Sequence, residues 1–121
     1  MTRINLVPPS ELSDKHLGAE YRELPRVFSL VRDAGARSER PDDPRNPKIY
    51  VLGPGHVRFF YPRLNFLAKR FTALIMECQS RNRVVNYPYV VALDIPTEWW
   101  GDYEPTPEAL ALNRQRIKER S

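Results

Sequence analysis

The sequence predicts an all-α fold, a compact single domain of three main helices joined by long irregular loops. Two segments repeat apolar residues at three- and four-residue spacing, and a third opens with a strong helix-start signal. The chain has 121 residues, a length that suits one hydrophobic core. We therefore expect residues 1–121 to form one domain.

The first predicted helix begins at Ser13 and Asp14, a capping hydroxyl followed by an acid at the positive end of the helix dipole. It extends to about Ala34. Pro25 interrupts it, and a proline inside a helix removes one backbone hydrogen bond. We expect a kink near residues 21–24 rather than two separate helices. One face carries the apolar side chains of Leu17, Tyr21, Leu24, Phe28 and Val31.

The second predicted helix covers about Tyr61 to Arg81. One side of it is apolar, which places that side in the core. The stripe consists of Leu64, Leu67, Phe71, Leu74, Ile75 and Cys78.

The third predicted helix begins at Thr106-Pro107-Glu108, a cap followed by a proline at the first helical position and an acid. It extends to about Arg120 and ends in a basic cluster, for which a solvated helix end is one explanation.

The connecting segments are irregular. Residues 35–48 are polar and rich in proline, which predicts a loop. The apolar run 49–52 is too short to assign to a strand or to a buried loop. Residues 82–103 look irregular and include Pro88 and the pair Trp99-Trp100, which we interpret as core anchors.

The net charge of +4 and the isoelectric point of about 9.5 favour a polyanionic partner. Arginine supplies most of the positive charge, and its planar group suits phosphate, although a compositional bias would give the same excess. Cys78 is the only cysteine, so no intrachain disulfide can form. The N-terminus lacks a secretory leader and no run approaches about 18 apolar residues, so we expect a cytoplasmic protein without a membrane span.

Few chemical motifs are present. Two histidines and one cysteine without ligand spacing predict no metal site, and no glycine-rich phosphate loop occurs. Thr2 follows Met1, and a residue that small normally permits removal of Met1. The exposed α-amine has an ordinary pKa of about 7.7 to 8.0, against about 10.4 for lysine, and is therefore a potential nucleophile for Schiff-base chemistry near neutral pH.

Two blocks, residues 1–6 and 19–28, resemble the T4 endonuclease V family of pyrimidine-dimer DNA glycosylases. Shorter matches follow in the same order through most of the chain. They lie at residues 16–17, 52–53 with 55–57, 59–61, 66–67 with 69–70, 74–75 with 77–78, and 94–96 with 101–103.

The resemblance implies an all-helical enzyme without a cofactor that acts on cyclobutane pyrimidine dimers in duplex DNA. It assigns the nucleophile to the amine of Thr2, which would form an imine with the sugar. Glu23 corresponds to the essential carboxylate, which would assist the β-elimination of an abasic-site lyase. The alternative for Glu23 is a surface pair with Arg26, three residues further along the helix.

The resemblance also implies contacts to DNA. One of the residues concerned is His16, for which simple packing in the helix is the alternative. The residues at the corresponding positions are Arg3, His16, Arg22, Arg26, Arg116 and Arg120.

The family carries an aromatic C-terminal tail implicated in dimer recognition, and residues 1–121 do not include one. The same chemistry on another damaged base therefore remains an alternative, as does a helical DNA-binding protein without catalysis. We expect a monomer whose partner is damaged double-stranded DNA.

Overall fold

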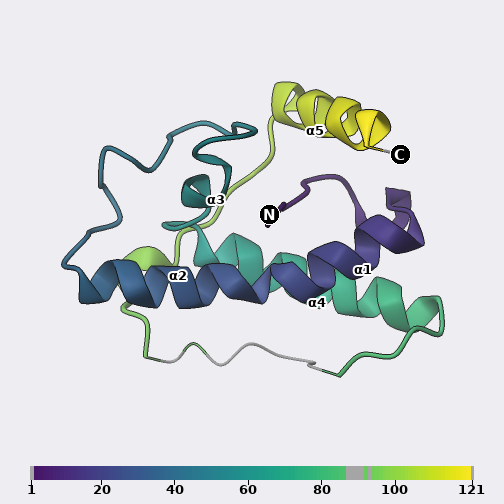
Figure 1. Ribbon diagram of the computed structural model, residues 1–121, viewed down its shortest axis with the longest axis horizontal. Helices are drawn as coiled ribbons and strands as arrows, with labels where there is room; N and C mark the ends of the chain where they lie inside the picture. The colour runs from purple at the N-terminus through teal and green to yellow at the C-terminus, as the bar shows by residue number, and fades with distance from the viewer. Residues whose placement is uncertain (1, 87–91, 93, 121) are drawn as a thin grey trace.

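The computed structural model describes residues 2–86, 92 and 94–120. These residues form five α-helices, two short 3-10 turns and no strand, so the all-α prediction is confirmed. Figure 1 shows α1 and α2 following one another almost in line, and the N-terminal segment between α1 and α5. Residues 87–91 and 93, with Pro88 of the predicted irregular segment, lie outside the described residues. The elements are η1 (Pro9–Glu11), α1 (Asp14–Glu23), α2 (Pro25–Ala36), α3 (His56–Phe59), α4 (Leu64–Ser80), η2 (Thr97–Trp99) and α5 (Pro107–Glu119).

The first predicted helix is divided at Leu24, whereas the sequence predicted one kinked helix. Leu24 keeps helical dihedral angles and its N–H still donates to the carbonyl of Glu20 at 2.9 Å. Pro25 has no N–H to continue the ladder, and the N–H of Val27 donates to Leu24 instead, three residues back. The position of the interruption was predicted correctly, but the proline separates two helices. The predicted cap is present, because Ser13 Oγ accepts from the N–H of His16 at 3.2 Å.

The second helix begins three residues later than predicted, at Leu64. Tyr61 precedes Pro62, and the residue before a proline is disfavoured in the helical region. The single helical turn α3 lies just before this point and has no counterpart among the predicted helices. The predicted stripe is confirmed as core, because all six of its side chains are buried. In α5, Thr106 Oγ1 accepts from the N–H of Ala109 at 3.1 Å, which confirms the third helix start.

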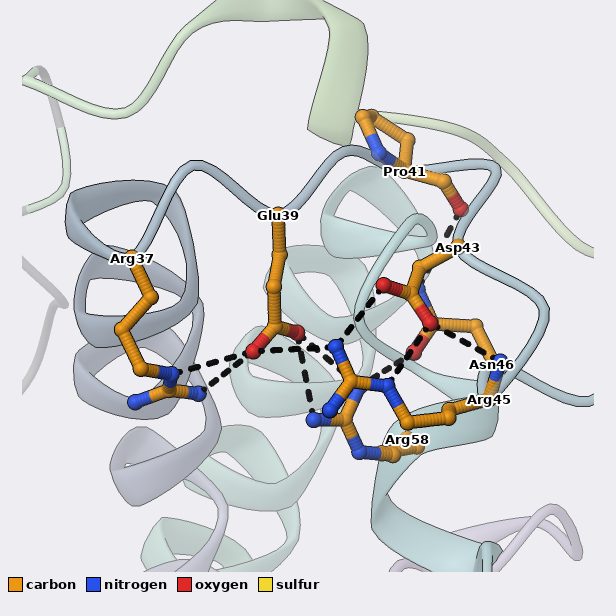
Figure 2. A network of polar contacts seen from close by, with 7 residues as sticks. All are labelled: Arg37, Glu39, Pro41, Asp43, Arg45, Asn46 and Arg58. Atoms are coloured by element: carbon orange, nitrogen blue, oxygen red, sulfur yellow. Dashed lines mark hydrogen bonds and ion pairs between the residues drawn. The ribbon is translucent and has the colours of Figure 1, made fainter.

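The segment between α2 and α3 is a loop, as predicted, and it is tied to α3 by ion pairs (Figure 2). The buried carboxylate of Glu39 accepts from Arg37 at 3.0 Å and from Arg58 of α3 at 3.1 Å. Arg45 joins the same carboxylate at 3.4 Å and pairs with Asp43 at 2.9 Å. Three arginines therefore pair with acids inside this cluster, and their positive charge is largely neutralised there.

The remaining connections complete the core. The run 49–52 is a loop rather than a strand, and Tyr50 within it is buried. Trp99 is buried and Trp100 donates from Nε1 to the carbonyl of Ile95 at 3.1 Å, so both act as the predicted core anchors. No helix within the described part of the chain is long and apolar enough to span a membrane.

A buried ion pair joins α1, α4 and the N-terminal segment. Arg70 donates to both oxygens of Glu20, at 2.8 and 3.0 Å, and also to the carbonyl of Val7. Asn5 Nδ2 donates to the same carboxylate at 2.9 Å. The side chains of Arg70 and Glu20 are 6% and 1% exposed, so neither charge has water as an alternative partner.

Removal of the Arg70 charge is expected to destabilise the protein strongly. Arg70→Met leaves the Glu20 carboxylate buried and unpaired, which lowers the free energy of unfolding by about 3 to 5 kcal/mol. The matched control is Lys69→Met, because Lys69 adjoins Arg70 but forms an exposed pair with Asp102, worth about 1 kcal/mol or less. Urea unfolding measures both. Similar small losses in the two variants would contradict this account of the buried pair.

Candidate active site

A cavity of about 330 Å³ lies between the N-terminal segment, α1 and the end of α5. Four of its side chains come from α1 at positions 16, 19, 20 and 23, a spacing that places them on one face of the helix. The lining residues are Arg3, Asn5, His16, Ala19, Glu20, Glu23, Ile117 and Arg120.

Asn113 of α5 fixes the backbone of the N-terminal segment. Its Oδ1 accepts from the N–H groups of Leu6 at 2.6 Å and Val7 at 3.1 Å, and its Nδ2 donates to Asn5 Oδ1 at 2.8 Å. Asn113 is fully buried, so these bonds are made without competition from water. The chain leading to Thr2 is therefore held against α5 by one amide side chain.

His56 of α3 holds the same segment closer to its end. Nε2 accepts from the N–H of Ile4 at 2.9 Å, which leaves Nδ1 to donate to the carbonyl of Val51 at 2.9 Å. This arrangement requires neutral imidazole. Burial, followed by the positive charges of Arg3 and Arg116, lowers the pKa of His56, against the opposing effect of the Val51 carbonyl.

Glu23 enters the cavity with one oxygen unmatched. Its Oε2 is buried and has no hydrogen-bond partner among the described residues, although buried polar atoms nearly always have one. Glu20, one turn earlier on the same face, has both oxygens bonded. The two carboxylates therefore differ: Glu20 is part of the fold, and Glu23 is free to interact with a cationic or donating ligand.

Positive charge surrounds Glu23. Burial, followed by the charges of Arg120 and Arg116, lowers the pKa of Arg3, while Tyr50 and Glu23 act in the opposite direction. Arg116 Nε is also buried without a partner in the described part of the chain. Three guanidinium groups thus crowd near one carboxylate, an arrangement that attracts an anion.

The arginines near Glu23 differ from most other arginines of the protein in having no acidic partner within the described part of the chain. Among the described residues, nine arginines form ion pairs with carboxylates, and Arg63 donates to backbone carbonyls. The five that have neither are the five arginines that the sequence analysis assigned to DNA. They are Arg3, Arg22, Arg26, Arg116 and Arg120.

The structure brings most of the expected site residues together. Arg3, His16, Glu23 and Arg120 share the cavity, and half-buried Thr2 directly precedes Arg3. Arg22 and Arg26 are exposed and do not line the cavity. Met1, whose removal was expected, lies outside the described residues.

A family model described as pyrimidine dimer DNA glycosylase matches residues 1–90. The chain belongs to this family. The match covers three quarters of the sequence, from the N-terminal segment through α4, and includes Arg3 and Glu23. It confirms the resemblance and makes the protein a DNA-repair glycosylase that acts on pyrimidine dimers in damaged duplex DNA. In this glycosylase, α5 with Arg116 and Arg120 lies beyond the matched residues.

Asn113 and His56 were not among the site residues predicted from the sequence. Their partners lie 107 and 52 residues away in the chain, so no local pattern marks them. The match around residues 52–57 contained His56, but only the structure shows that it holds Ile4.

The role of His56 predicts a pH dependence of stability. Because the folded protein lowers the pKa of His56, the unfolded chain binds the proton first as the pH falls. The free energy of unfolding therefore decreases below about pH 6.5, by up to about 1.4 kcal/mol per pH unit, until the lower folded pKa is reached.

His56→Gln isolates this contribution, since a glutamine amide can accept from Ile4 and donate to Val51 without titrating. Urea unfolding between about pH 7.5 and about pH 5.5 is expected to show a smaller loss of stability in His56→Gln than in the wild type. Parallel pH profiles would exclude a neutral, structural His56.

Proposed function

We propose that the protein is a bifunctional enzyme, a glycosylase for cyclobutane pyrimidine dimers that is also a DNA-(apurinic or apyrimidinic site) lyase. The nucleophile is the α-amine of Thr2 after removal of Met1. The observation that carries the proposal is the buried, unpartnered oxygen of Glu23 in a cavity bordered by the N-terminal segment. An unsatisfied carboxylate beside basic groups is typical of a catalytic site.

The first step replaces one bond to the sugar with another. The neutral amine of Thr2 attacks C1′ of the damaged nucleotide, and the bond from C1′ to the base breaks as the base leaves with the electron pair. The amine loses a proton and the sugar ring opens, which gives a protonated imine between Thr2 and C1′. The negative charge of Glu23 stabilises the positive charge that develops at the sugar.

The second step cuts the strand. A base, which we assign to Glu23, removes a proton from C2′ of the imine, and the electron pair forms the double bond between C2′ and C3′. The bond from C3′ to oxygen breaks, and the 3′ phosphate leaves. Hydrolysis of the remaining imine returns the free amine of Thr2.

The unpaired arginines would hold the duplex. Phosphate contacts position DNA without reading its bases, which suits an enzyme that recognises distortion rather than sequence. A dimer weakens stacking, so a nucleotide can be extruded at lower cost there than in undamaged DNA. We assign His16 to the cavity contacts with DNA. We further propose that residues 1–121 act as one domain, as a monomer without metal or cofactor, on DNA in the cytoplasm.

Borohydride trapping tests the nucleophile. Protein lacking Met1 is incubated with duplex containing one cis-syn thymine dimer, or with abasic duplex, and borohydride then reduces the imine to a stable adduct. We expect adducts with both duplexes, and none from protein whose N-terminal amine is acetylated. An adduct with the abasic duplex alone would retain the lyase but refute the dimer as substrate. No adduct with either would refute the amine mechanism.

Substitution of the carboxylate tests its role. Glu23→Gln keeps the size of the side chain but removes the charge and the proton acceptor, so nicking is expected to fall by about 10² to 10⁴-fold. Duplex affinity should be retained, because Gln still fits the cavity. Glu108→Gln, an exposed acid of α5, is the control and should nick normally. Normal nicking by Glu23→Gln would support a protein in which Glu23 has no catalytic role.

A further inference from the structure

A second basic site lies on α1, away from the catalytic cavity. Gly18 has no side chain, and two guanidinium groups occupy the space beside it. A Cβ at Gly18 would lie 3.1 Å from Arg22 Nη1 and 3.2 Å from Arg83 Nη2. Both nitrogens are therefore close to one point, and a single anion can be reached by both.

The site lies on the opposite edge of α1 from Glu23. Gly18 and Glu23 are five residues apart, which places their side chains roughly 140° apart around the helix axis. The exposed ridge of α1 between them carries Lys15 and Arg22. A ligand that lies across this ridge can reach the cavity on one side and Arg83 on the other.

The charges at this edge are not balanced within the described residues. Asp14 is the carboxylate nearest to Arg83, at 3.8 Å, and its other oxygen is bonded to Arg81 at 3.0 Å. Arg22 has no ion pair or hydrogen bond there. Arg22 and Arg83 therefore converge although the acid beside Arg83 is exposed and shared with Arg81. The two like charges repel each other and are stabilised by an added anion.

We propose that Arg22 and Arg83 together bind one backbone phosphate of the DNA, on the edge of α1 opposite the cavity. The inference rests on the proposed action on duplex DNA and extends it, because Arg83 has no assigned role. Each guanidinium group can donate to the phosphate oxygens, and arginine binds phosphate strongly because its planar group donates two N–H bonds at once. The absence of a side chain at Gly18 leaves room for the pair.

The first measurement compares affinities for a short undamaged duplex by fluorescence anisotropy, so that catalysis does not interfere. Arg83→Ala is expected to bind about 3- to 10-fold more weakly at 0.1 M salt. The control is Arg40→Ala, since Arg40 is also exposed but is paired closely with Glu98, at 3.0 Å. Thermal melting confirms that both variants are folded. Equal affinity of Arg83→Ala and Arg40→Ala would overturn the proposal.

The salt dependence of binding counts the phosphates. If both arginines share one phosphate, the double variant Arg22→Ala/Arg83→Ala lowers the slope of log affinity against log salt by about 0.9. If each binds its own, the slope falls by about 1.8, and the shared site is refuted.

The trapping experiment on the unaltered protein keeps this inference separate from the lyase chemistry. A wild type that forms no adduct, with weakened binding by Arg83→Ala, would refute the imine mechanism and leave the phosphate site standing.

Discussion

The buried pair between Glu20 and Arg70 is the interaction on which the rest of the structure depends. It joins α1 to α4 and, through Asn5 and the carbonyl of Val7, fixes the N-terminal segment to both. Charges so completely removed from water are stable only when each is fully bonded. The pair therefore admits one arrangement of three chain segments. Glu23 enters the cavity one helical turn beyond it, so the same face of α1 that satisfies one carboxylate leaves the next one open.

The proposed nucleophile is a terminal amine, which poses a structural problem that an internal side chain does not. The end of a chain is ordinarily frayed, because it is restrained by the chain on one side only. Here the restraint comes from Asn113 of α5 and His56 of α3, which bond the backbone at Leu6, Val7 and Ile4. Each bond ends on a backbone N–H rather than on a side chain, so it fixes the course of the chain itself. Thr2 thereby precedes a segment whose position is fixed from Ile4 onward, two residues later in the chain.

The sequence predicted the helices well and the site only in part, for physical reasons. Apolar spacing and caps are local, so α4 and α5 could be predicted from them, and Pro25 marked the interruption at Leu24. One turn of helix such as α3 has too few residues to show a period. The roles of Glu23 and of the arginines assigned to DNA were predicted only from the resemblance to a family. The bonds made by Asn113 and His56 join residues far apart in the chain, and a single sequence carries no pattern for such pairs.

The distribution of paired and unpaired arginines links the structure to the proposed function. Most arginines are neutralised within the fold, as in the Glu39 cluster that ties the loop to α3 (Figure 2). The five arginines assigned to DNA form no ion pair with the described residues, and burial, followed by the charges of Arg120 and Arg116, lowers the pKa of Arg3. Stability alone would favour pairing or separating these charges. A bound phosphate would relieve the same repulsion, beside the cavity that holds the unmatched oxygen of Glu23. On the proposed function, the folded protein thus forgoes some stability in the free state, and binding of DNA would restore it at the proposed catalytic cavity.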